Sequence, residues 1–104
     1  MLAMTGTLRT PESVRALPLL AQNLRRHHEH LLLSGSQMLV VITGVGTVLV
    51  TSEPRLMRFD VVADSRNDFE VRCASLEANI QNRLPGVRTV TTWASSSSIP
   101  VPFR

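Results

Sequence analysis

The three histidines of the chain lie within four positions, in the stretch Leu-Arg-Arg-His-His-Glu-His that spans residues 24–30. Imidazole is a common ligand of zinc and iron, and it titrates near neutral pH. If a helix continues through the stretch, His27 and His30 are three positions apart and share a face. If the helix ends near His28, then His28 and His30 point to the same side of an extended segment. Either geometry supplies two ligands, whereas a stable site needs three or four.

A structural role for the same stretch competes with the metal site. Positive side chains complement the negative C-terminal end of a helix, and one imidazole can be hydrogen-bonded in the core. Leu17, Leu20 and Leu24 lead to His27 at helical spacing, so we predict that His27 is the most buried histidine. The candidate metal ligands are His27 and His30, and a metal ion bound there is the one cofactor considered. The chain has no second His or Cys cluster, so further ligands would come from carboxylates or another subunit.

The remaining motifs do not support a catalytic centre. Gly44-Val45-Gly46 resembles the start of a dinucleotide-binding loop, but Leu49 stands where a third glycine is needed. Its position between two strands predicts a hairpin or bulge instead. Cys73 lies on an apolar helix stripe, which favours packing over nucleophilic chemistry. No serine has a nucleophile-elbow pattern, and helix capping and strand exposure account for the acidic residues. The sequence therefore predicts no catalytic residues.

Composition narrows the class of protein. A chain of 104 residues with 43% hydrophobic residues is one globular domain. One cysteine precludes an internal disulfide, which fits the reducing cytoplasm. No apolar run is long enough to cross a bilayer, and the N-terminal residues lack the pattern of a secretory signal.

Charge argues against a nucleic-acid partner. All eleven basic residues are arginines, and the net charge is only +3, whereas nucleic-acid binding usually requires clustered positive charge and aromatic stacking platforms. The use of arginine without lysine is typical of a GC-rich, bacterial genome.

The hydrophobic pattern predicts alternating blocks of strand and helix. A short extended segment at residues 7–8 precedes a helix that begins at Thr10-Pro11, with a kink or the true helix start at Pro18. Further strands are expected at 31–33, 38–43, 47–51, 57–63 and 87–93. A second helix follows Asn67, which with Glu70 resembles a capping box.

This order, β-α-β-β-β-β-α-β, predicts an α+β two-layer sandwich, with a mostly antiparallel sheet and two helices on one face. Alternation at 57–63 directs Phe59 toward the helices and Arg58 toward solvent. Residues 1–94 form the single domain, and residues 95–104 form a Ser/Pro-rich C-terminal tail. The predicted core comprises Leu17, Leu20, Leu24, Val40, Ile42, Val48, Val50, Phe59, Val61, Phe69, Cys73, Leu76 and Ile80.

Several short motifs resemble a bacterial family of domains of unknown function, roughly a hundred residues long, that is associated with siderophore-interacting proteins. The matching features are a helix ending in Leu-x-x-His-x-x-His (residues 24–30), a glycine hairpin before a small-apolar strand (44–50), a strand ending in alanine (56–63) and a last strand ending in Trp93. The resemblance implies a compact α+β fold and an iron-related context. Members tend to carry another histidine late in the second helix, where this chain has Asn79, which places any shared histidine site in doubt.

Two functional hypotheses follow. The first is a non-catalytic binding or accessory module that acts through its surface on a protein partner, or on itself as a homo-oligomer joined at a sheet face or edge strand. The second is a metal-, haem- or siderophore-linked protein that uses His27 and His30.

Overall fold

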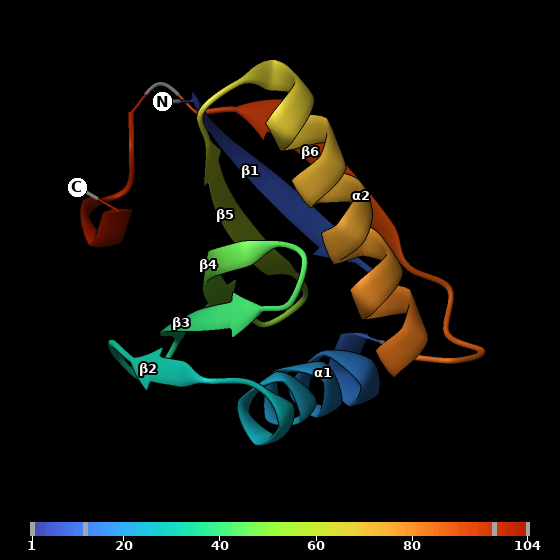
Figure 1. The fold of residues 1–104 in the computed structure, drawn as a ribbon. Coiled ribbons are helices and arrows are strands. Elements are labelled where there is room, and N and C mark those ends of the chain that lie inside the picture. Colours follow the sequence, from blue (N-terminus) through green and yellow to red (C-terminus); the bar gives the residue numbers. More distant parts are fainter. Residues whose placement is uncertain (1, 12, 97, 104) are drawn as a thin grey trace.

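The computed structural model describes residues 2–11, 13–96 and 98–103 and has the predicted element order and fold class (Figure 1). A six-stranded sheet forms one layer and two helices form the other. The elements in chain order are β1 (Leu2–Arg9), α1 (Ser13–His27), β2 (His30–Leu32), β3 (Gln37–Ile42), β4 (Gly46–Ser52), β5 (Met57–Ala63), α2 (Arg66–Arg83), β6 (Val90–Ser95) and the short 3-10 turn η1 (Val101–Phe103).

The strand order across the sheet is β2-β3-β4-β5-β1-β6, and every neighbouring pair is antiparallel. The opening strand β1 is eight residues long, far more than the two residues expected from sequence. It lies between β5 and β6, so hydrogen bonds on both edges hold a segment whose own strand propensity is modest. β2 and β6 are the two outer strands.

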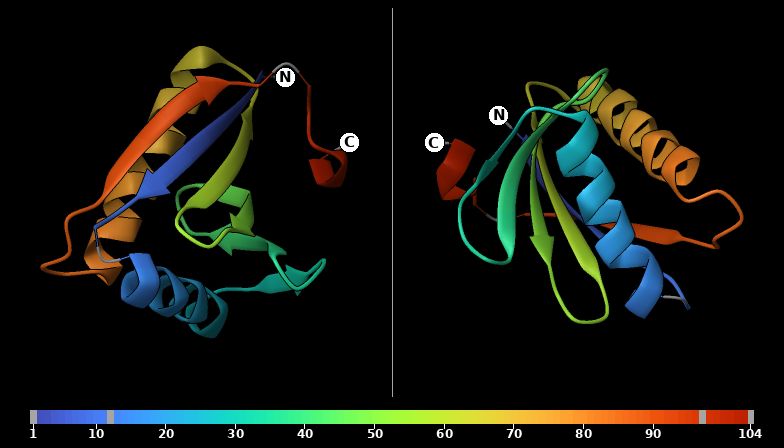
Figure 2. Two further views of the ribbon diagram at one scale, coloured as in Figure 1. Left: turned by 180° about the vertical axis from the view of Figure 1, so that it is seen from behind. Right: turned by 90° about the horizontal axis from the view of Figure 1, so that it is seen from below.

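The helices cover the face of the sheet that carries Phe59, as Figure 2 shows from behind and from below. Along β5, Phe59 and Val61 are buried whereas Arg58 is exposed, which confirms the predicted alternation. Every predicted core residue is buried except Cys73, which is only half-buried. The other face, which we call the open face, exposes Val41, Thr47 and Arg58 but buries Leu49 and Thr51.

The helix α1 begins at Ser13 and continues through Pro18, so the predicted alternative start near Pro18 is wrong. Proline removes one backbone hydrogen bond there, but Leu17 and Leu20 on the same turns are buried in the core. Packing of this apolar stripe outweighs the local preference against helix.

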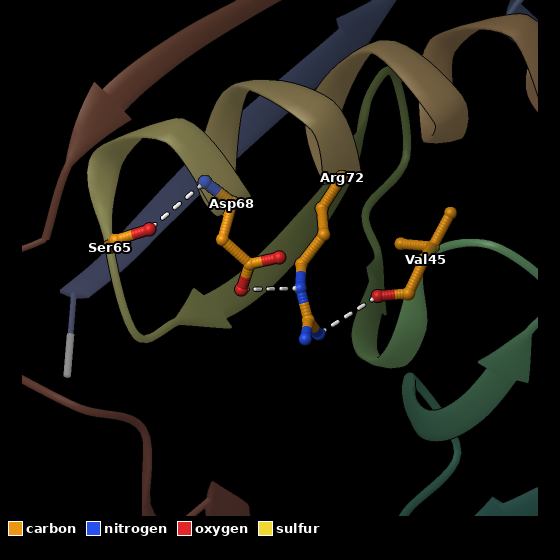
Figure 3. A network of polar contacts seen from close by, with 4 residues as sticks. All are labelled: Val45, Ser65, Asp68 and Arg72. Carbon is orange, nitrogen blue, oxygen red and sulfur yellow. Dashed lines mark hydrogen bonds and ion pairs between the residues drawn. The ribbon is translucent and has the colours of Figure 1, made fainter.

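The cap of α2 is Ser65, two residues before the predicted Asn67. Ser65 Oγ accepts a hydrogen bond from the Asp68 N–H at 3.1 Å (Figure 3). Both residue types cap helices well. The earlier cap is used because β5 ends at Ala63 and the chain turns at once onto the sheet.

Arg72 joins α2 to the hairpin between β3 and β4 (Figure 3). Its Nε donates to Asp68 one turn earlier, and its Nη1 donates to the Val45 carbonyl, each at 3.0 Å. Gly44 and Gly46 on either side of Val45 have φ angles of 83° and 94°, a conformation that favours glycine. The predicted hairpin is therefore confirmed.

Hydrogen bonding to the sheet extends beyond residue 94. β6 ends at Ser95, and the Ser96 N–H donates to the Ala3 carbonyl at 2.9 Å. The predicted tail thus begins with two residues that contact β1. Among the described residues, no helix is long and apolar enough to cross a membrane.

Gly6 provides a test of the packing between sheet and α2. A Cβ atom at this position would lie 2.7 Å from the Trp93 ring, which is held by a 2.6 Å hydrogen bond to Glu77. We expect Gly6→Ala to lower the free energy of unfolding by about 1–3 kcal/mol, because a well-packed site has no room for another methyl group. Urea denaturation of the variant measures this loss.

Gly35→Ala is the matched control, because a Cβ atom there meets nothing within 4 Å. Equal stability of the two variants would contradict the close packing of Trp93 over β1.

Candidate functional site

The structure separates the three histidines of the opening stretch. His27 is the last residue of α1 and is exposed, His28 is half-buried, and His30 is the exposed first residue of β2. The prediction that His27 is the most buried is therefore wrong. Positions 27 and 28 lie on either side of the apolar stripe that ends at Leu24, so a contact from another element decides which ring turns inward.

That contact is Arg83, near the end of α2. Its Nε donates to Asn79 Oδ1 at 2.7 Å, and its Nη1 donates to Asn23 Oδ1 on α1. Its Nη2 donates to His28 Nε2. We call Asn23, His28, Asn79 and Arg83 the Arg83 cluster. It joins the C-terminal ends of two helices that are far apart in sequence.

The electrostatics of the Arg83 cluster favour a neutral imidazole. Partial burial lowers the pKa of His28 below its ordinary value of 6.5, and the positive charges of Arg83 and His27 lower that pKa further. Nε2 accepts a hydrogen bond from a guanidinium, so the ring carries its proton on Nδ1. The basic lone pair is occupied, and the imidazole serves to hold the helix ends together.

The proposed metal ligands His27 and His30 do not belong to this cluster. His30 Nδ1 lies 3.3 Å from the His28 carbonyl oxygen, and both side chains are exposed. In the described part of the chain, no three side chains among His, Cys, Asp and Glu gather as a ligand set. The metal site at His27 and His30 stays a prediction. Asn79 accepts a hydrogen bond from the same guanidinium that contacts His28.

Cys73 is poorly suited to nucleophilic chemistry. Partial burial, with the Glu77 carboxylate nearby, raises the pKa of the Cys73 thiol to about 11. A thiol with so high a pKa is almost fully protonated at neutral pH.

An outer edge of the sheet, for which the hydrophobic pattern predicted only a strand, is apolar and exposed. Leu31, Leu32 and Leu33 expose 59%, 60% and 41% of their surface. The first two belong to β2, an outer strand with no residue buried. We call residues Leu31–Leu33 the leucine edge. The available signal was the absence of polar alternation, because a strand with one face in water normally alternates.

A shallow groove adjoins the leucine edge on the open face of the sheet. Its volume is about 310 Å³. Leu31, Leu39 and Val41 supply apolar walls. Its polar lining residues are Glu29, His30 and Thr47. Leu39 pairs with Leu31 on one side and with Leu49 on the other, so a continuous apolar row crosses three strands. Leu49 is only 4% exposed although it lies on this open face.

Comparisons with known proteins support the fold alone. No family model and no curated protein matches the chain. A solved structure, the NMR structure of PA4090 from Pseudomonas aeruginosa, is similar with a TM-score of 0.55. The sequences are 14% identical, and the match covers 90% of this chain and 96% of the other.

The Arg83 cluster predicts a loss of stability in mild acid. Because the folded pKa of His28 lies below its ordinary value of 6.5, the unfolded chain binds more protons as pH falls below that value. Stability is therefore fully present above pH 6.5 and decreases below it. Melting curves between about pH 8 and about pH 5 measure the slope of stability against pH. This interval lies above the range where carboxylates titrate.

His28→Gln keeps an acceptor for Arg83 but does not titrate, so we expect it to flatten the slope. His27→Gln, a change at the exposed neighbour, leaves the slope as it is. An unchanged slope in His28→Gln would show that the cluster does not sense pH.

For His27 and His30, the exposed pair of histidines, we expect added Zn²⁺ or Fe²⁺ to leave the melting temperature of untagged protein unchanged. Two ligands do not make a stable site. A metal that binds the folded state at a hundredfold excess over its Kd would instead add about 2.7 kcal/mol. A saturable stabilisation, lost in both His27→Ala and His30→Ala, would establish the metal site.

Proposed function

We propose that the chain is a non-catalytic binding module whose binding surface is the leucine edge. The observation that carries this proposal is the exposure of three consecutive leucines on an outer strand. Burying one leucine side chain is worth about 1.5–3 kcal/mol. Leaving three of them in water is costly, and a partner that covers them recovers this free energy.

The lack of protection at this strand supports the proposal. Outer strands usually carry charged residues or proline, which prevent pairing with other chains. β2 has the sequence His-Leu-Leu, followed by Leu33 and Ser34, and contains neither a permanently charged residue nor a proline. The opposite outer strand, β6, has no comparable apolar run: its sequence is Val-Thr-Thr-Trp-Ala-Ser.

A metal-, haem- or siderophore-linked role for His27 and His30 is the alternative. It rests on the spacing of the two histidines and on the family resemblance, and the metal titration described above tests it. The exposure of the leucine edge favours the binding module.

The proposal is tested by photo-crosslinking in the cells that produce the protein. A photo-reactive side chain replaces Leu32 and forms a covalent adduct with any protein in contact with it. The matched position is Val71 on α2, which is 56% exposed against 60% for Leu32. We expect covalent adducts at position 32 and none at position 71, because only the edge contacts a partner. Mass spectrometry identifies the adduct, and an added Leu31→Lys change is expected to abolish it.

Equal adduct formation at the two positions, or none at either, would contradict the proposed binding surface.

A further inference from the structure

Some backbone N–H and C=O groups of β2 point away from the sheet, and their direction limits which kind of partner can bind there. The Val41 N–H donates to the Glu29 carbonyl at 2.9 Å, and the Leu33 N–H donates to the Gln37 carbonyl at 3.0 Å. In an antiparallel pair, hydrogen-bonded residues alternate with residues that point away. Residues 29, 31 and 33 therefore point their backbone groups toward β3. His30 and Leu32 direct theirs to the open edge of the sheet.

We propose that a second copy of this chain binds there, with β2 paired antiparallel to β2 of the other copy around a two-fold axis at Leu31. This inference rests on the proposed function, since it uses the same leucine edge. The axis places His30 of each copy opposite Leu32 of the other. Because these are the residues with outward backbone groups, the pairing forms four backbone hydrogen bonds and joins two six-stranded sheets.

The side chains fit the same register. Leu31 faces its own equivalent as a pair without mutual hydrogen bonds, in which side chains lie closest. Leu33 of one copy lies opposite Glu29 of the other, on the open face of the sheet. Glu29 and Leu31 both line the 310 Å³ groove, so the Leu33 side chain enters that groove. Each copy thus inserts its Leu33 side chain into the groove of the other copy, and the two-fold axis relates these two contacts.

The charges near the axis also allow self-association. The uncharged Leu31 lies opposite Leu31 of the other copy. Glu29 lies opposite Leu33 of the other copy rather than opposite a second Glu29. No residue with a permanent charge therefore faces its own equivalent, which would be destabilising. Figure 1 shows β2 at the side of the molecule away from α2, and β2 is an outer strand of the sheet.

The size of the contact indicates a weak dimer. A pairing of three-residue strands buries less than the roughly 800 Å² per partner of a standard stable interface. We therefore expect a reversible dimer with a Kd on the order of 1–100 µM. In analytical ultracentrifugation of the untagged chain, the weight-average mass should rise with concentration from 11.5 kDa toward twice that value.

Two variants test the interface. Leu31→Lys places two positive charges face to face at the axis, and we expect it to keep the chain monomeric at every concentration. Val71→Lys, an equally exposed change on α2, should dimerise as the unaltered chain does. Melting curves confirm that both variants are folded.

Disulfide trapping tests the register. In a Cys73→Ala background, Leu31→Cys should form a covalent dimer under mild oxidation, because the two Cα atoms lie within the disulfide limit of about 7 Å. Leu33→Cys should not, since its two copies are four residues apart along the strands, or about 13 Å. Cross-linking of Leu33→Cys in preference to Leu31→Cys would overturn the register.

The outcomes separate this inference from the proposed function. A chain that stays monomeric at millimolar concentration, while position 32 still forms adducts with a different protein, overturns the second copy but retains the binding edge. A dimer that persists in Leu31→Lys overturns the second copy at β2, because its interface lies elsewhere, and adduct formation at position 32 then decides whether the leucine edge binds a different partner. A dimer that is lost in Leu31→Lys and trapped at position 31 supports both.

Discussion

The helix layer reaches across only part of the sheet, and this limit places β2 outside the core. Six strands spaced about 4.8 Å apart span roughly 24 Å, whereas a single helix is only about 10–12 Å wide. The covered face extends as far as β3, where Met38, Val40 and Ile42 are buried, and it stops before β2, where every residue is exposed. The fold therefore leaves one strand outside its own core, and that strand carries the leucine edge.

Polar contacts hold the helix layer in place, and one of them is the hydrogen bond from Trp93 of β6 to Glu77 of α2. Arg72 attaches α2 to the β3–β4 hairpin, and Arg83 attaches α2 to Asn23 and His28 of the α1 end. The histidine stretch supplies one acceptor, His28, to these contacts. The exposed His27 and His30 flank the turn from α1 into β2.

Much of the fold could be predicted because it depends on local periodicity. Alternation at β5 and the apolar stripes of both helices identified the buried face, and Phe59 and Leu24 lie where the pattern placed them. Two of the errors arose where local signals were nearly equal. Ser65 and Asn67 are both good helix caps, and His27 and His28 lie equally close to the stripe that ends at Leu24.

The contacts and the exposure of the candidate site were harder to predict from the sequence than the fold. The partner of His28 is 55 positions away along the chain, and no spacing rule links the two residues. The exposure of Leu32, which pairs with the buried Met38, depends on how far the helices reach across the sheet, and the hydrophobic pattern does not encode this reach. Pairing at the leucine edge can be measured by hydrogen exchange of the His30 and Leu32 amides as the protein concentration rises. If β2 pairs with β2 of a second copy, these two amides exchange fast in dilute solution and become protected at high concentration. Exchange that stays fast at all concentrations would contradict this pairing.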